Sequence, residues 1–323
     1  MRKIVVTIIG VVMSMMTFAA PTVTDVVAKQ RYPWGVVDIT CKVEGLDETT
    51  KGFEFVASAI VPNLGITNRL SHIWVMKDGA KSIDRVIKAN GNYHLLWDAK
   101  ADLGAVRYTN MVVSVIIDRA MVQLWKDGPY WATTNIGAEK SEDYGYYFWW
   151  GDTVGYKREN DKWVASDGSN SNFSFGSGNT PTYNKSISTL QSEGWITADG
   201  VLTPEHDAAQ VHWGGNWRMS TRGDFDALLS NCDWSWTTMN GVNGYIVRGK
   251  GDYASNSIFL PCAGYGSGTS RYYAGSFGYY WSSVPDSDSS YAWRLYFSSG
   301  HHSTHFDSRY YGRSVRPLQR FTK

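Results

Sequence analysis

A stretch near the C-terminal end of the chain concentrates side chains that could do chemistry. Residues 297–318 read FSSGHHSTHFDSRYYGRSVRPL, with three histidines, one aspartate, several serines and two tyrosines, and almost no aliphatic residue. Such a set could ligate a metal ion, form a Ser-His-Asp catalytic triad, or present hydrogen-bonding groups to a partner. The local secondary structure decides between these uses.

The metal and triad interpretations can be weighed from spacing. His301 and His305 are four residues apart, but the glycine and hydroxyl residues beside them disfavour the helix that would align them for zinc. On a strand they would share a face with Ser303, so a loose metal site stays an alternative. Ser303, His302 and Asp307 contain the groups of a hydrolase, yet no G-x-S-x-G turn frames them. We expect no metal, no cofactor and no catalytic residue here.

The preceding residues predict a strand that sorts side chains by face. In residues 291–297, YAWRLYF, period-two alternation places Trp293 and Phe297 on the core side. The same alternation places Arg294 and Tyr296 on the outward side.

Composition excludes several classes of protein. The 323 residues include 31 Lys and Arg against 30 Asp and Glu, so no overall field draws the chain to nucleic acid. Fifteen Trp, 20 Tyr and 12 Phe can build a large core, which excludes a disordered chain, and 32 Gly predict many turns.

The first residues have the pattern of a secretory signal peptide, residues 1–19. Arg2 and Lys3 precede an apolar run over residues 4–16 and a small-residue exit, with cleavage expected after Ala19. A retained N-terminal anchor is the alternative. No second apolar stretch is long enough to span a bilayer. We expect a secreted or cell-surface protein without an integral membrane segment after signal removal.

The rest of the chain divides into two segments with different sequence patterns. Residues 22–120 read as short strands separated by Gly, Asn and Asp, which predicts an all-β, immunoglobulin-like sandwich. Residues 121–320 mix strands with a helix signal, in which Thr221 caps the helix and Asp224 completes a capping box. The expected fold class is α+β.

Three cysteines, Cys41, Cys232 and Cys262, follow the expected signal peptide. In an oxidising compartment one pair could bridge, and Cys232 with Cys262 is the favoured pair because both belong to the second domain. Buried free thiols are the alternative.

Six blocks carry a family resemblance. GPYWATTNIGAEKSEDYGYYFWWGD, WGGNWRMSTRGDFDALL, GVNGYIV, SIFLPCAGY, YYWSSV and GRSVRPL occur in this order between residues 122 and 318. Together they resemble the Fibrobacter succinogenes major paralogous domain, whose fold is similar to that of C-type lectins and formylglycine-generating enzymes. The resemblance implies a compact, loop-rich domain. It does not imply an enzyme, because neither Cys232 nor Cys262 lies in the catalytic context of the oxidases. It does not imply lectin-type calcium binding either, because the calcium-binding triplets of the lectins are absent.

The resemblance also separates fixed positions from free ones. It implies structural roles for Trp217, Arg218, Trp281, Gly312 and Arg316. The side chains left between the fixed positions are expected to face outward and bind a ligand: Ser287, Asp288, Ser290, Tyr291, Arg294, Tyr296, Ser298, His301, His302, Ser303, His305, Asp307, Tyr310, Tyr311 and Arg313.

This outward set has the chemistry of a paratope, because Tyr gives rigid contact area and Ser and Asp give adaptable hydrogen bonds. Every residue from Ser298 to Arg313 can be encoded by a codon ending in C. Targets of diversity-generating retroelements have that restriction. We expect a protein that binds an extracellular protein or glycan. The alternatives are a formylglycine-generating-type oxidase and a structural surface-layer component.

Overall fold

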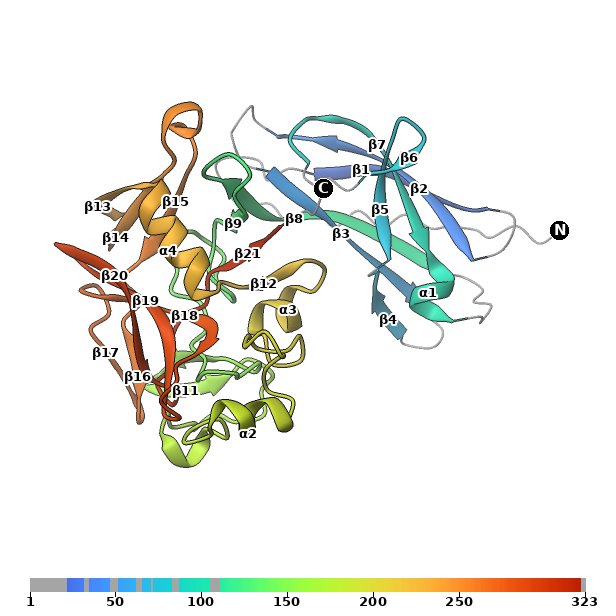
Figure 1. Ribbon diagram of the computed structural model, residues 1–323. Coiled ribbons are helices and arrows are strands. Elements are labelled where there is room, and N and C mark those ends of the chain that lie inside the picture. Colours follow the sequence, from blue (N-terminus) through green and yellow to red (C-terminus); the bar gives the residue numbers. More distant parts are fainter. Residues whose placement is uncertain are drawn as a thin grey trace. The chain divides into compact units, whose positions relative to one another are not determined.

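The computed structural model describes residues 22–31, 35–46, 52–61, 66–70, 72–82, 87–104 and 111–320 (Figure 1). The expected signal peptide lies outside these residues. The chain divides into two compact units, here called unit 1, which ends at Ala120, and unit 2, Met121–Arg320. This boundary coincides with the change in sequence pattern between residues 120 and 121. None of the helices in the described ranges has the length and apolar character needed to cross a bilayer.

Unit 1 contains two sheets. The first has the strand order β1-β2-β7-β5-β6, and the second contributes the order β8-β3-β4. The elements are β1 (Thr22–Gln30), β2 (Val36–Glu44), β3 (Gly52–Val61), β4 (Ile66–Arg69), β5 (Ile73–Lys77), β6 (Ala80–Lys81), β7 (Gly91–Asp98), α1 (Ala99–Leu103) and β8 (Val112–Gln123).

The core of unit 1 takes side chains from both sheets. Along β2, Ile39, Cys41 and Val43 are buried at every second position, as the sequence alternation predicts. They pack in one cluster with Phe55 of β3 and Val113 of β8. A core shared between two antiparallel sheets is the arrangement of a β-sandwich.

Unit 2 has more strands than helices, and its sheets are small. Their orders are β12-β21-β9 with the end of β8, β13-β14-β15, β18-β19-β20, β10-β11 and β16-β17, with the strands of each paired antiparallel. The elements are β9 (Tyr130–Ala132), β10 (Tyr156–Glu159), β11 (Lys162–Ala165), α2 (Ile187–Ser192), α3 (Ala208–Trp213), β12 (Trp217–Met219), α4 (Arg222–Asn231), β13 (Asp233–Met239), β14 (Val242–Arg248), β15 (Ser257–Pro261), β16 (Tyr265–Ser267), β17 (Ser270–Tyr272), β18 (Gly278–Pro285), β19 (Tyr291–Ser298), β20 (His301–Ser308) and β21 (Pro317–Gln319).

The two ends of unit 2 meet in one sheet. Trp131 of β9 lies opposite Leu318 of β21 and opposite Val122 of β8. All three side chains are buried. The chain therefore enters and leaves unit 2 on strands that flank the same short strand.

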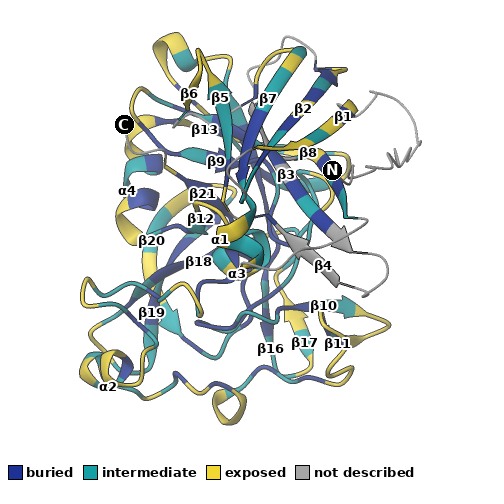
Figure 2. Cartoon of the chain, turned by 90° about the vertical axis from the view of Figure 1, so that its right-hand side faces the viewer, coloured by how far each residue is buried: buried dark blue, intermediate teal, exposed yellow. Residues whose placement is uncertain are grey.

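The helix α4 forms where the sequence predicts it. Thr221 accepts a hydrogen bond from the backbone N–H of Asp224, and the Asp224 carboxylate accepts one from the backbone N–H of Thr221, which completes the capping box. Phe225 and Leu228 are buried, so their side of the helix packs inward. Figure 2 shows this helix with one buried side and one exposed side.

The chain as described is thus mostly β, in several antiparallel sheets, with short helices added in unit 2. The expected fold class is therefore confirmed at the coarse level of a β-rich chain with some helix.

Candidate binding surface

The sheet β18-β19-β20 carries the stretch with the unusual chemistry. Its strands form two hairpins, and Tyr296 of β19 lies opposite both Tyr279 of β18 and Ser303 of β20. Because side chains alternate along a strand, these three residues share one face of the sheet with Arg294 and His305. We call this the tyrosine side of the sheet.

The fifteen residues expected to bind a ligand differ in exposure. Figure 2 shows β20 with its exposed and intermediate positions. The exposed residues are Ser287, Asp288, His301, His302 and His305. The partly exposed ones are Ser290, Tyr291, Tyr296, Ser298, Ser303, Asp307, Tyr310 and Tyr311. The buried ones are Arg294 and Arg313.

The expectation that Arg294 and Arg313 face outward is wrong. Arg294 is 8% exposed and Arg313 is 1% exposed. Alternation along β19 does place Arg294 and Phe297 on different faces of the sheet. The tyrosine side, however, is itself covered by other segments, among them the chain around Tyr265 and Tyr311. Both faces of β19 are therefore largely buried, and Arg294 takes part in the packing.

The two arginines share one carboxylate. Nη2 of Arg313 lies 2.8 Å from Oδ2 of Asp307, and Nη2 of Arg294 lies 3.2 Å from the same oxygen. Burial alone would raise the pKa of Asp307, but the charges of Arg313 and Arg294 outweigh it and hold the pKa below its usual range. The other oxygen of Asp307 accepts from the backbone N–H of Ser308 at 2.8 Å. We call these three side chains the Arg–Asp–Arg cluster.

Aromatic rings enclose the cluster. The guanidinium carbon of Arg313 lies 4.7 Å from the ring centre of Tyr279 and 5.5 Å from those of Tyr265 and Tyr311. That of Arg294 lies 4.9 Å from Tyr279 and 5.0 Å from Tyr296. These distances are those of cation–π interactions. Attraction to the two guanidinium groups therefore holds the rings in place in addition to packing.

The rings above the cluster form a continuous row of contacts. The ring centres of Tyr310 and Tyr311 lie 4.6 Å apart, and Tyr311 lies 4.9 Å from Tyr265. From Tyr265 the contacts pass through Tyr273 and Phe277 to Tyr296, with centre distances from 5.2 to 6.0 Å. The members of this tyrosine row are Tyr265, Tyr272, Tyr273, Phe277, Tyr296, His301, Tyr310 and Tyr311.

All eight members of the tyrosine row are at least partly exposed, and Tyr272, Tyr273 and His301 are exposed. Tyr272 is 46% exposed and Tyr273 is 56% exposed. Exposed aromatic side chains that gather in one place are a frequent mark of interaction sites. The row is therefore the candidate binding surface.

The hairpin of β16 and β17 was not among the expected site residues. It supplies Tyr265 and Tyr272, and the turn after it supplies Tyr273 and Phe277. A signal was present, since residues 263–280 are as rich in Gly, Ser and Tyr as the C-terminal stretch. Composition could have indicated these residues, but only the fold brings them beside Tyr296.

The expected set does not form a single surface. His302 lies on the opposite face of β20, stacked on Trp234 with ring centres 4.9 Å apart and an interplanar angle of 8°. Burial lowers the pKa of His302. Tyr291 contacts Phe306 on the same opposite face. Ser287, Asp288 and Ser290 lie in the turn before β19, where Ser290 Oγ donates to Asn184.

The histidines lie too far apart to hold one ion together. His301 and His305 lie four residues apart on a strand, a separation of roughly 13 Å. The His301 ring contacts Ser303 Oγ at 3.1 Å, and the His305 ring contacts the Phe306 carbonyl at 2.8 Å. Within the described residues no group of three or more His, Cys, Asp or Glu side chains could hold a metal ion.

Of the five residues expected to be structural, four are buried in unit 2 and Arg218 is partly exposed. Trp217 and Trp281 are fully buried, and the indole N–H of Trp281 donates to the Phe148 carbonyl. Arg218 pairs with Asp224 of the capping box at 2.7 Å.

Arg316 and Gly312 hold the chain near its C-terminal end. Arg316 donates to Asn135 Oδ1 at 2.8 Å, to the Ala132 carbonyl at 3.0 Å and to the Phe259 carbonyl at 2.9 Å. It thereby joins three separate segments. A Cβ at Gly312 would lie 2.4 Å from a ring carbon of Phe175, so only glycine fits there.

The favoured disulfide is not formed. Cys41, Cys232 and Cys262 are all buried free thiols, which is the alternative that the sequence left open. Burial raises the pKa of Cys41 to about 11 and those of Cys232 and Cys262 to about 12. Because the thiolate is the reactive form, these thiols are poor nucleophiles at neutral pH.

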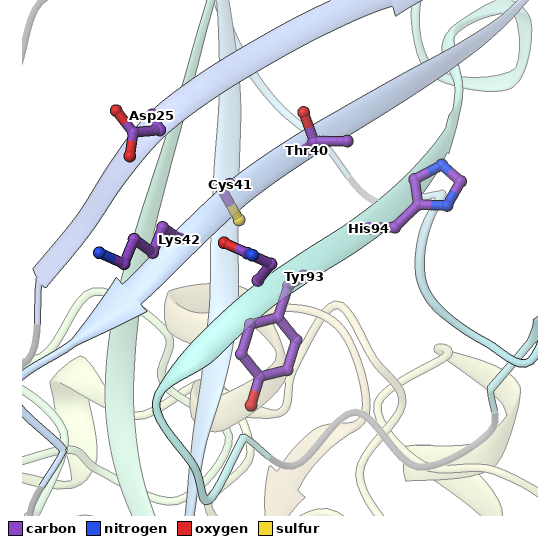
Figure 3. A pocket seen from close by; sticks show the side chains of 7 residues that line it. Asp25, Thr40, Cys41, Lys42, Tyr93 and His94 are labelled. Carbon is purple, nitrogen blue, oxygen red and sulfur yellow. The ribbon is translucent and has the colours of Figure 1, made fainter.

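A shallow hollow of about 340 Å³ lies in unit 1 (Figure 3). It runs across the neighbouring strands β1, β2 and β7, and its lining residues are Asp25, Thr40, Cys41, Lys42, Asn92, Tyr93 and His94. Tyr93 donates its hydroxyl to the Ala89 carbonyl, and Lys42 pairs with Glu44. These polar groups have partners within the chain, and the Cys41 thiol is not activated.

Comparison with known proteins gives one family match. Residues 236–318 match the model of a domain of unknown function, DUF8237. This segment contains β14 to β20 and all eight members of the tyrosine row. The chain matches no curated protein and no solved structure.

Proposed function

We propose that the protein binds a ligand outside the cell, without a covalent step, through the tyrosine row. The observation that supports this most directly is the unbroken series of ring contacts from Tyr310 to His301, in which every member keeps part of its surface exposed. The ligand class is a protein or a glycan. Tyrosine suits such contacts because it offers a large amphipathic surface and loses little side-chain entropy on binding.

Rigid support beneath the row favours this use. Tyr279 is 8% exposed and contacts Tyr265 and Tyr296, which are members of the row. The Arg–Asp–Arg cluster holds the inner sides of the same rings. A surface whose side chains are already ordered pays less entropy on association, which raises affinity.

The fold proposal belongs with the functional one. We infer that unit 2 is a C-type-lectin-like major paralogous domain, since its two ends meet at β9 and β21 and its sheets are small and linked by long ordered loops.

The secreted or surface location is proposed from the N-terminal sequence pattern alone. Diversification of residues 298–313 is proposed only for the exposed members, because Arg309 and Arg313 lie in the core.

An oxidase of the formylglycine-generating type is not proposed. That chemistry would need reactive thiols, whereas burial raises the pKa of Cys232 and Cys262 to about 12. A purely structural surface-layer role has no observation in its favour.

The experiment is a glycan and protein array probed with the chain without its expected signal peptide. Tyr273→Ala removes the most exposed tyrosine of the row and should weaken binding at least tenfold, as expected for a central aromatic contact. Tyr253→Ala removes a partly exposed tyrosine outside the row and should bind as the wild type does. Equal binding by all three proteins would place the ligand elsewhere and refute the proposal.

A further inference from the structure

The charges beneath the tyrosine row do not cancel. The Arg–Asp–Arg cluster contains two cations and one carboxylate, so one positive charge is left over. Burial, followed by repulsion from Arg294, lowers the pKa of Arg313 to about 9, which still leaves it charged at neutral pH. Asp307 cannot offset both arginines.

Several N–H groups of the cluster have no acceptor within the chain. Nη1 of Arg294 and both Nε and Nη1 of Arg313 are buried without a hydrogen-bond partner. Buried unsatisfied donors are rare and call for an explanation. Here the donors lie among ring faces, since Arg313 contacts Tyr265, Tyr279 and Tyr311 at cation–π distances.

The guanidinium groups on the inner sides of the tyrosine rings determine which ligand charge the outer sides favour. Tyr265, Tyr296 and Tyr311 each already have a guanidinium on one side. The buried positive charge would repel a second cation that approached the row from outside. It would attract an anion that lay beside the ring edges, where the tyrosine hydroxyls can donate hydrogen bonds to its oxygens.

We propose that the ligand of the tyrosine row is an acidic polysaccharide, whose sugar rings lie over the exposed ring faces and whose carboxylates are drawn to the buried positive charge. This rests on the proposed function and names its ligand class. A row of aromatic side chains in successive contact is an extended surface, which suits a polymer of repeating units better than a single compact epitope.

The test compares two forms of one polymer, namely polygalacturonate and its methyl-esterified form, for binding to the chain without its expected signal peptide. Calorimetry should give binding to the carboxylated form that weakens as ionic strength rises, and binding to the esterified form roughly tenfold weaker or lost. The Tyr272→Ala, Tyr273→Ala double variant should lose binding to the carboxylated form. Equal affinity for both polymers, binding to neither, or binding that survives the double variant would each overturn the proposal.

A charge variant adds an independent readout. Arg294→Met keeps much of the side-chain volume and removes one buried charge, so it should bind polygalacturonate roughly tenfold more weakly. Lys126→Met removes one charge from an exposed turn of unit 2 and serves as the matched control, with unchanged affinity expected. Equal losses in both variants would attribute the attraction to overall charge and refute the role of the cluster. Should Arg294→Met not fold, the comparison of the two polymers decides alone.

The two proposals fail in different ways. A chain that binds a neutral glycan or a protein through Tyr273 keeps the proposed function and refutes the acidic ligand. A chain whose array ligands are unaffected by Tyr273→Ala refutes both.

Discussion

Nη2 of Arg313 lies 2.8 Å from Oδ2 of Asp307, and both residues belong to the set that the sequence predicts to face outward and bind a ligand. Arg313 is in fact fully buried, and Asp307 is shared with Arg294. The cluster of Arg294, Asp307 and Arg313 lies beneath the partly exposed tyrosines and contacts their rings through the two guanidinium groups.

Removal of that support should destabilise unit 2. Asp307→Asn leaves two buried guanidinium groups facing each other without a counter-charge, so we expect a loss of about 3 kcal/mol in the free energy of unfolding. Urea denaturation measures it. Asp161→Asn, which breaks the exposed ion pair with Arg158, is the control and should change stability little. An equal effect of the two substitutions would contradict the account of the cluster.

The close approach at Gly312 gives a second prediction. Gly312→Ala would place a Cβ 2.4 Å from the Phe175 ring and should cost about 1–3 kcal/mol through displaced packing. Gly300, in the turn between β19 and β20, has open space where its Cβ would lie, and Gly300→Ala should be nearly neutral. Thermal unfolding of the two alanine variants compares them directly, and similar midpoints would show that the Phe175 contact is unimportant.

The thiols should resist modification in the native protein. Because burial raises the pKa of Cys232 and Cys262 to about 12, little thiolate exists at pH 8, and a thiol-reactive dye should label them slowly until denaturant is added. All three cysteines should then react. Two unreactive residues that appear only after reduction would reveal a disulfide and return the oxidase to consideration.

Histidine burial predicts a pH dependence of stability. Burial lowers the pKa of His212 below its ordinary value of 6.5, and its ring contacts the Thr153 carbonyl at 2.9 Å. The folded state thus binds this proton less tightly than the unfolded state. The contribution of His212 to stability is full above pH 6.5 and declines as pH falls through 6.5 toward the folded pKa.

His212→Gln isolates that contribution, since its amide N–H can still donate to the Thr153 carbonyl. The free energy of unfolding of the wild type minus that of the variant should fall between pH 7.5 and pH 5.0. A difference that stays constant over this range would contradict a lowered pKa for His212.

Local signals were the part of the structure that the sequence could predict. The capping box of Thr221 and Asp224 depends on residues three apart, and it forms as expected. The alternation along β2 likewise gives its buried face correctly. Both signals are contained within one element, so no distant segment can change them.

The errors arise where distant segments meet. Alternation separates Arg294 from Phe297, but it cannot indicate that the chain around Tyr265 and Tyr311 covers the arginine. Likewise, Trp163 of β11 is fully buried although Asp161 and Lys162 directly precede it in the sequence. Such burial follows from long-range packing, which one-dimensional periodicity does not contain.

The pairing of β9 with both β8 and β21 has a consequence for how this unit can be used. The entry and exit strands flank a single strand, so Val122 and Leu318, which both lie opposite Trp131, are only about 10 Å apart. A host protein could accept residues 121–320 as an insertion in one of its surface turns without stretching its own backbone. The same proximity would allow the ends to be joined and new termini to be opened at Gly300, giving a circularly permuted domain.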